Sequence, residues 1–314
     1  MNTLAAGISY VDVNFLHVPG IIATAVLHGP GGVALVDPGP SSTLPALRAA
    51  LGSAGIAPVD LRAILLTHIH LDHAGATGTL AAENPALRVY VHEKGAPHLI
   101  DPEKLIASAT RLWPNEMDAL WGEFRPVPAN RLDVLRGGER ISAGGRDLAV
   151  LYTPGHASHH VSYFSADSGI AFVGDTAGIR REPGRFVLPP TPPPDIDLEL
   201  WRDSLARIGD WGAETLFVTH FGPSTPARGH LTEMGEHLDL VGGLATASLA
   251  LQGTDEDREA WYTEALRREL RKRMTDADAR AYEVAGRFDL NWRGLARYWR
   301  KKGQGTQGDR NSQA

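Results

Sequence analysis

The 314-residue chain contains no cysteine. Disulfide bonds and thiolate ligands are therefore excluded, and any bound metal ion must be held by nitrogen and oxygen atoms. No charge of one sign dominates either, because 31 basic residues against 37 acidic ones give a formal net charge of −6. Proteins that bind nucleic acids usually present a broad basic surface, and this mildly acidic composition does not indicate one. We therefore expect a small-molecule substrate and no nucleic acid.

Long apolar runs are also missing. The first residues, from Met1 to Gly7, lack the charged segment and apolar stretch of a secretory signal. No later window approaches the roughly 18 apolar residues that a membrane span needs. We therefore expect a cytoplasmic protein without membrane contact, and the sequence leaves open whether it forms a homodimer.

Short runs of apolar and β-branched residues predict buried strands. Segments with helical periodicity, such as 42–51 and 198–208, lie between them. Strands that alternate with helices are typical of a layered α/β domain. The predicted strands are 33–36, 63–66, 89–91, 148–152, 170–173 and 216–218.

From about residue 226 the strand signals end and helical periodicity continues to residue 299. We predict a catalytic domain over 1–225 and a helical subdomain over 226–302. The final segment, 303–314, is rich in Gly and Gln, which predicts a disordered tail. The helices expected in the subdomain are 231–251, 257–274 and 276–299.

A proline-rich segment, 183–195, interrupts the α/β part of the chain. Its run of prolines from Pro189 to Pro194 excludes a central strand or a helix interior. We expect a stiff loop that forms a wall of the active-site cleft. Substrate selection is expected to reside in this loop, in segment 98–131 and in the C-terminal helices.

The densest cluster of chemically active side chains is Thr67-His68-Ile69-His70-Leu71-Asp72-His73. At the end of a strand, His68 and His70 point to the same side because side chains repeat with a period of two, so both can reach one metal ion. Asp72 and His73 follow as the chain turns toward a helix and can face a neighbouring ion.

Further ligands stand where later predicted strands end, namely His156, Asp175 and His220. His156 completes a three-nitrogen site with the first two histidines, and His220 completes a second site with Asp72 and His73. Asp175 is then free to bridge the two ions. Such metal pairs lie roughly 3.5–4 Å apart and can share a hydroxide.

These residues resemble the metallo-β-lactamase superfamily, because His-x-His-x-Asp-His, Gly-His, Gly-Asp and a final His occur in order. The resemblance runs from about Gly7 to Gly222 and implies a four-layer αβ/βα sandwich with the metals at one edge. Asp37, in Val36-Asp37-Pro38-Gly39, matches an early motif of the family that supports the site without being a ligand. Within the family, the dinuclear hydrolases of the glyoxalase II and lactonase kind are most similar.

The resemblance implies a hydrolase in which a metal-bridging hydroxide cleaves an ester, thioester or lactone. Asp72 is the expected catalytic residue, since it can give a proton to the leaving group. Two divalent ions are expected, zinc first, with iron or manganese as alternatives. The absence of cysteine argues against true β-lactamase activity, because the zinc β-lactamases often use a Cys ligand.

Several other polar residues have two interpretations. His160 is either structural or a hydrogen-bonding support of the metal site, whereas His159 is expected to be a plain loop residue. His230 lies either in the cleft or on the surface, and Arg180 and Arg181 bind an acidic substrate group or remain solvated. The isolated histidines and the late aromatic residues are expected to have structural or surface roles: His17, His28, His92, His98, His237, Trp292, Tyr298 and Trp299.

Two other enzyme classes stay open. A persulfide dioxygenase of the same superfamily would use a subset of these ligands for one iron ion. A phosphodiesterase or nuclease would direct the same hydroxide at a phosphodiester, although the acidic net charge argues against this. A non-catalytic binding module is the weakest alternative, because every ligand position carries a competent residue.

Overall fold

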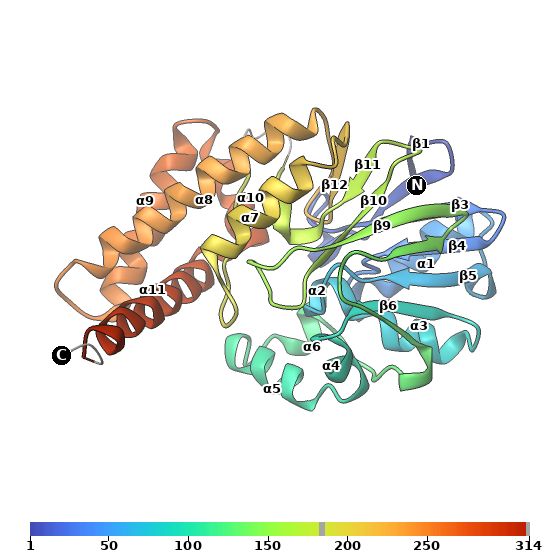
Figure 1. Ribbon diagram of the computed structural model, residues 1–314, viewed down its shortest axis with the longest axis horizontal. Helices are drawn as coiled ribbons and strands as arrows, with labels where there is room; N and C mark the ends of the chain where they lie inside the picture. The colour runs from blue at the N-terminus through green and yellow to red at the C-terminus, as the bar shows by residue number, and fades with distance from the viewer. Residues whose placement is uncertain (182–185, 312–314) are drawn as a thin grey trace.

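Two β-sheets pack face to face, and helices cover their outer faces (Figure 1). The computed structural model describes residues 1–181 and 186–311, with side chains as far as residue 304. Buried residues of both sheets, such as Leu65 and Tyr163, form the core between the sheets. Two further cores lie outside, one against α1 and α3 and one against α7 and α8. The predicted four-layer αβ/βα sandwich is therefore confirmed.

The first sheet contains the N-terminal strands in the order of the sequence, β1 to β7. The pairs β4–β5, β5–β6 and β6–β7 are parallel and the earlier pairs are antiparallel. Parallel strands covered on both faces need apolar side chains on both, which explains the continuous apolar runs in the sequence. The strands are Asn2–Ala5, Ile8–Asp12, Ala23–Gly29, Gly32–Val36, Leu61–Leu65, Arg88–His92 and Leu132–Leu135.

The second sheet has the order β13-β12-β11-β10-β9-β8. Only the pair β11–β12 is parallel, and α7 lies between these two strands in the sequence. The strands are Arg140–Ala143 (β8), Arg146–Tyr152 (β9), Val161–Ser165 (β10), Ile170–Phe172 (β11), Thr215–Val218 (β12) and Gly222–Ser224 (β13).

The helices in the sandwich part include three that lie together below the sheets in Figure 1, α4, α5 and α6. The sequence interpretation assigned no structure to this segment. The helices are Leu44–Ser53 (α1), Leu71–Ala74 (α2), Thr77–Glu83 (α3), Ala96–Ile100 (α4), Glu103–Leu112 (α5), Met117–Leu120 (α6) and Leu198–Gly209 (α7). Short 3-10 turns are Phe15–His17, Ser41–Thr43, Pro58–Asp60, Ala129–Arg131 and Gly174–Ala177 (η5).

The C-terminal helices pack beside the sandwich around their own apolar core (Figure 1). They are Ala227–Leu249 (α8), Asp255–Arg271 (α9), Asp276–Gly286 (α10) and Phe288–Asn311 (α11). Trp292 is buried in this core and donates its indole N–H to Ser248 Oγ at 2.8 Å, in agreement with the predicted packing role. No described helix is both long and apolar enough to cross a bilayer.

The single helix predicted over 276–299 is wrong. Two helices form instead, and the chain turns between them at Arg287, whose φ is +36°. A left-handed residue ends an α-helix, and helical periodicity on both sides concealed the break. At the other end, α11 continues through 303–311, where the sequence predicts disorder, and 312–314 lie outside the described residues. Residues 183–185 of the predicted proline loop also lie outside them.

Candidate metal centre

The seven predicted ligands come from separate elements that end at one edge of the sandwich. His68 and His70 follow β5, and Asp72 and His73 lie on α2 immediately after them. The other three lie at the ends of later strands: His156 follows β9, Asp175 lies on η5 after β11, and His220 follows β12. Strand ends are rigid, so residues far apart in sequence are held in fixed positions.

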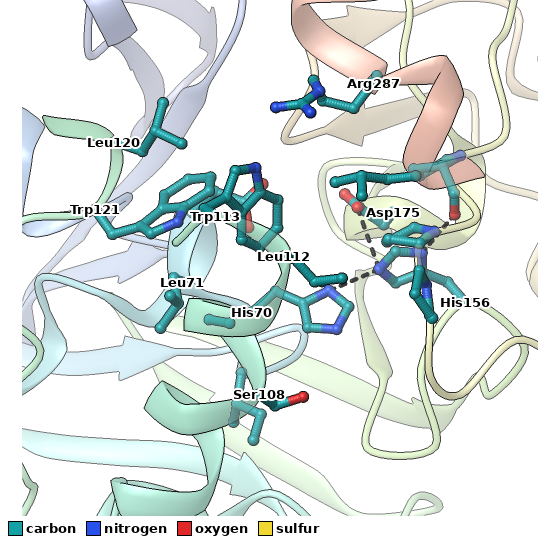
Figure 2. A pocket seen from close by; sticks show the side chains of 18 of the residues that line it. His70, Leu71, Ser108, Leu112, Trp113, Leu120, Trp121, His156, Asp175 and Arg287 are labelled. Carbon is teal, nitrogen blue, oxygen red and sulfur yellow. Dashed lines mark hydrogen bonds and ion pairs between the residues drawn. The ribbon is translucent and has the colours of Figure 1, made fainter. Parts of the chain in front are cut away.

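Three imidazole nitrogens converge on one point. His70 Nδ1 lies 2.9 Å from His68 Nε2 and 2.9 Å from His156 Nε2. Figure 2 shows His70 and His156 turned toward each other across this point. Three neutral ring nitrogens at such distances form a donor set suited to a divalent ion. The structure thus brings together the first predicted group.

A second group lies directly beside the first. Asp72 Oδ2 is 3.2 Å from His220 Nε2 and 3.7 Å from His73 Nε2. Asp175 stands between the groups, with Oδ1 3.1 Å from His73 Nε2 and Oδ2 3.4 Å from His156 Nε2. One carboxylate therefore faces both clusters, as the sequence predicts for a bridging ligand.

The donor atoms fit metal ions on two independent grounds. Each group of three offers ligand atoms that all lie within 4.8 Å of one another. Moreover, His73 Nε2 and Asp175 Oδ1 are fully buried and have no hydrogen-bond partner among the described residues. Burying a polar atom without a partner costs about 1–3 kcal/mol. A bound cation would satisfy both atoms.

In three of the ligand histidines, the ring nitrogen that does not face the metal position, Nδ1, lies 2.8 Å from a hydrogen-bond acceptor. His73 Nδ1 donates to Asp37 Oδ2, His156 Nδ1 to the carbonyl of Pro190, and His220 Nδ1 to the carbonyl of Ile21. A carbonyl only accepts, so it fixes the proton on Nδ1 and leaves Nε2 free for a metal. Local backbone groups thereby set both the tautomer and the ring orientation.

Asp37 lies behind the ligands and is completely buried. Besides the His73 bond, its carboxylate accepts hydrogen bonds from the Thr67 amide at 2.8 Å, the Thr67 hydroxyl at 2.7 Å and the Thr219 hydroxyl at 2.8 Å. Thr67 and Thr219 immediately precede His68 and His220. One carboxylate therefore ties the ends of β4, β5 and β12 together, in the supporting position that the sequence predicts.

The electrostatics differ between the two groups. Burial and the neighbouring His156 lower the pKa of His70 to about 4. Burial also opposes a charge on His73, but Asp175 and Asp72 outweigh it and raise the pKa of His73 well above its usual range. The pKa of Asp72 is lowered to about 2, because His73 and His220 outweigh the effect of its burial. The first group is thus a neutral nitrogen set, and the second carries carboxylate charge.

The family model of the metallo-β-lactamase superfamily matches residues 17–220, more than half of the chain. The chain belongs to this superfamily. It is accordingly a metallo-β-lactamase-fold hydrolase of a family whose members bind metal ions. The matched segment contains all seven ligand positions.

Individual relatives share part or all of this fold. A metallo-β-lactamase fold-containing protein of Sulfurisphaera tokodaii is 27% identical over 257 residues, which cover 78% of this chain and 93% of that protein. Hydroxyacylglutathione hydrolase of Thermosynechococcus vestitus is 29% identical over 153 residues, which cover 48% of this chain and 47% of that enzyme. The second match thus spans about half of either chain.

A solved metallo-β-lactamase family protein from Thermus thermophilus superposes with a TM-score of 0.73 at 24% identity, over 96% of this chain and 95% of that one. The match therefore includes most of the C-terminal helices. Rm3 metallo-β-lactamase superposes with a TM-score of 0.54 at 19% identity, over 74% of this chain and 90% of that one. At such identities the likeness shows a shared fold.

The candidate metal centre opens into a pocket of about 640 Å³. Figure 2 shows Trp113, Leu120 and Trp121 on one side of this pocket and Asp175 and His156 on the other. The walls come from α5 and α6, from the proline loop at 190 and 192–195, and from the junction of α10 and α11. All three segments expected to select the substrate therefore line the pocket, and the loop forms a wall as predicted.

The proline loop is attached to the C-terminal helices on its far side. Asn291 Oδ1 accepts a hydrogen bond from the Thr191 amide at 2.8 Å, and the Thr191 hydroxyl donates to the Asn291 carbonyl at 3.1 Å. A Cβ at Gly294 would collide with the Thr191 carbonyl, so only glycine permits α11 this approach. Pro190, which fixes His156, thus neighbours a residue held by α11.

His160 and His159 both stack on His68, with ring centroids 5.0 and 6.0 Å from it, respectively. His160 is buried, and its Nδ1 lies 2.8 Å from the Thr153 hydroxyl and 3.2 Å from the Thr176 hydroxyl. In the described part of the chain it makes no hydrogen bond to a predicted ligand, so its contacts agree with the structural interpretation. The prediction of a plain loop role for His159 is wrong. Its ring is buried and lines the pocket, because the β9–β10 loop folds over His68. Its position beside His160 was the available sequence signal.

The remaining ambiguous residues have structural contacts. His230 is buried and bonds to the Ser224 hydroxyl at 2.9 Å, so it lies neither in the cleft nor on the surface. Arg180 donates to the Pro223 carbonyl on β13, and Arg181 donates to the Gly20 carbonyl, so both side chains make contacts within the protein. Of the isolated histidines, His98 lines the pocket.

Proposed function

We propose that the chain hydrolyses an ester, thioester or lactone of a small molecule, using two divalent ions that are most simply zinc. His68, His70 and His156 would hold one ion, and Asp72, His73 and His220 the other. Asp175, which faces both groups, carries this proposal because it places the two donor sets side by side. Ions at these positions would supply Lewis acidity and lower the pKa of bound water toward neutrality.

Asp72 is suited to proton transfer. Its side chain is 23% exposed, lines the pocket and is oriented by the contact between Oδ2 and His220 Nε2. A carboxylate fixed at the pocket floor can accept a proton from the attacking water and return it to the leaving alkoxide or thiolate. We therefore assign Asp72 as the general acid and base of the proposed reaction.

His159 is suited to orient the substrate carbonyl. Its Nδ1 accepts a long hydrogen bond, 3.4 Å, from the Ile69 amide, so the neutral ring carries its proton on Nε2. Burial lowers the pKa of His159 well below its usual range, so this ring is neutral. Within the described residues Nε2 has no protein partner, and the ring lines the pocket. A fixed N–H donor is thus available to the carbonyl oxygen.

The test begins with protein purified without added metal. Elemental analysis is expected to give two ions per chain, and the protein is expected to hydrolyse at least one of three panels: aryl esters, acyl thioesters and lactones. Asp72→Ala should lower kcat by about 10²–10⁴-fold. One iron per chain with oxygen consumption on a thiol substrate would instead establish a dioxygenase. Metal-loaded protein inactive on all three panels would refute the proposal.

A further inference from the structure

The pocket wall formed by α5 carries two parallel stripes of opposite character. Lys104, Ser108 and Arg111 recur at spacings of four and three residues, and the neighbouring Leu105, Ala109 and Leu112 repeat the same spacing. All six residues line the pocket. Residues three and four apart lie on one face of a helix, so an aliphatic stripe runs beside a cationic one.

The aliphatic stripe continues into an aromatic wall. Trp113 follows α5 directly and packs edge-on against Trp121, with ring centroids 5.1 Å apart. Phe15 also stacks on Trp121, with ring centroids 5.7 Å apart. Together with Leu112 these rings form a broad apolar surface facing the metal ligands (Figure 2). Contact between this apolar surface and water is unfavourable. An apolar group of a ligand would remove the surface from water and so bind favourably.

The cations of this pocket have few anionic partners. Arg287 lies 2.9 Å from Asp289 and 3.9 Å from Glu116, whereas Lys104 and Arg111 have no carboxylate within 4.0 Å in the described part of the chain. Lys94, also at the pocket, bonds to the Tyr152 hydroxyl at 2.8 Å and likewise has no described carboxylate partner. Across residues 1–181 and 186–304, three cations without a carboxylate partner thus border one apolar pocket, and an anionic ligand group would complement them.

We propose that the substrate is amphiphilic: an ester or thioester with an apolar acyl group of medium length and an anionic group elsewhere in the same molecule. The acyl group packs against Leu105, Leu112 and Trp113, and Lys104 and Arg111 bind the anionic group. This substrate class rests on the proposed hydrolytic function. In this proposal, residues of α5 select the substrate, whereas the metal ligands serve the chemical step.

The decisive comparison uses thioesters that differ in one feature at a time. Acetyl, butanoyl and octanoyl groups are attached either to 4′-phosphopantetheine, which is anionic, or to pantetheine, which lacks only the phosphate and is neutral. We expect kcat/KM to rise about fourfold per added methylene, the equivalent of roughly 0.8 kcal/mol for each buried CH₂. The anionic series should exceed the neutral one by about tenfold, less at high salt.

Two variants connect these preferences to α5. The double variant Lys104→Ala/Arg111→Ala should lose most of the preference for anionic thioesters and keep the preference for long acyl groups. The variant Leu112→Ala should lose most of the chain-length preference and keep the preference for anionic thioesters. The matched control is Arg228→Ala/Arg297→Ala, two exposed arginines away from the pocket that have no carboxylate partner within the described residues. Equal kcat/KM for acetyl and octanoyl substrates, or a double variant indistinguishable from its control, would overturn the inference.

A binding measurement separates this inference from the proposed function. S-octyl-coenzyme A is a thioether that cannot be hydrolysed, so calorimetry with the protein as purified can measure its affinity against that of coenzyme A alone. If no thioester is turned over but S-octyl-coenzyme A binds in a manner that requires Lys104 and Arg111, only the hydrolytic function fails. If short neutral thioesters are hydrolysed and S-octyl-coenzyme A binds no better than coenzyme A, only the inference fails.

Discussion

The two halves of the metal centre are supported by different parts of the molecule. On one side, His73 is fixed by the carboxylate of Asp37, which lies inside the sandwich and also accepts hydrogen bonds from residues at the ends of β5 and β12. On the other side, His156 is fixed by the carbonyl of Pro190, in a loop that Asn291 of α11 holds from behind. One support is charged and internal, and the other is neutral and depends on the appended helices.

This difference indicates that the sandwich alone does not complete the site. The group with Asp72, His73 and His220 needs only strand ends and the loop carbonyl of Ile21. The group with His156 also needs the proline loop in place. Loss of the internal support should therefore affect the fold and one ion together, whereas loss of the external support should affect mainly the other ion.

The largest effect is expected when both ions of the proposed two-ion centre are removed. Ions that bind only the folded chain stabilise it, by about 4 kcal/mol at a concentration 1,000 times their Kd. Dialysis against a chelator should therefore abolish esterase or thioesterase activity and lower the melting temperature, and added Zn²⁺ should restore both. An unchanged melting temperature after verified metal loss would show that no ion contributes to folding.

Asp37→Asn should have the next largest effect. The amide keeps the shape and tolerates the left-handed φ of +50° at this position, but it loses the charge that faces His73. We expect about 3 kcal/mol of lost stability and one ion bound about 10–100-fold more weakly. Denaturant unfolding and competition with a chromophoric chelator measure the two quantities. The control is Asp210→Asn at an exposed position. If Asp37→Asn had the same stability and metal affinity as this control, Asp37 would not support this half of the centre.

Asn291→Ala should weaken the other half of the centre. The variant leaves the buried Thr191 amide unpaired, which costs about 1–3 kcal/mol, and it loosens the loop that orients His156. We expect one of two ions to bind about 10-fold more weakly. Cobalt substitution, followed by its visible spectrum during titration, should show a change in the histidine-rich site. A change of the same size in exposed Asn130→Ala would argue against this route.

Thr219→Val should have the smallest effect on stability and on metal affinity among these variants. It removes one of the four hydrogen bonds to Asp37 and keeps the shape of the side chain. We expect about 1 kcal/mol of lost stability with nearly unchanged metal affinity, because three donors remain. Urea denaturation measures the change against exposed Thr232→Val. A large loss of metal would show that the support depends on every donor.

The comparison also separates what the sequence could predict from what it could not. The seven ligand positions follow from motifs at strand ends, because there a short peptide places several donors in a fixed direction, and the supporting role of Asp37 follows from the family resemblance. Asn291 gave no such signal. Its partner Thr191 is 100 residues away, and a hydrogen bond between a side chain and a distant backbone amide leaves no local pattern in the sequence.

Boundaries and buried contacts were harder to predict than elements. The apolar runs identified the central strands because these strands are covered on both faces. The break at Arg287 has no sequence signal, because a single left-handed residue does not interrupt apolar periodicity. His159 was also misjudged, since its burial depends on how a loop folds over His68. In both cases tertiary packing determined the outcome.

The attachment of α11 to the proline loop also bears on how the protein is made. Every predicted ligand has been synthesised by residue 220, yet the residue that secures the loop behind His156 is Asn291. During translation from the N-terminus, the chain would thus carry a complete set of ligands before it can fix all of them. A truncated chain that ends before the last helix should retain one firm half of the centre and one loose half.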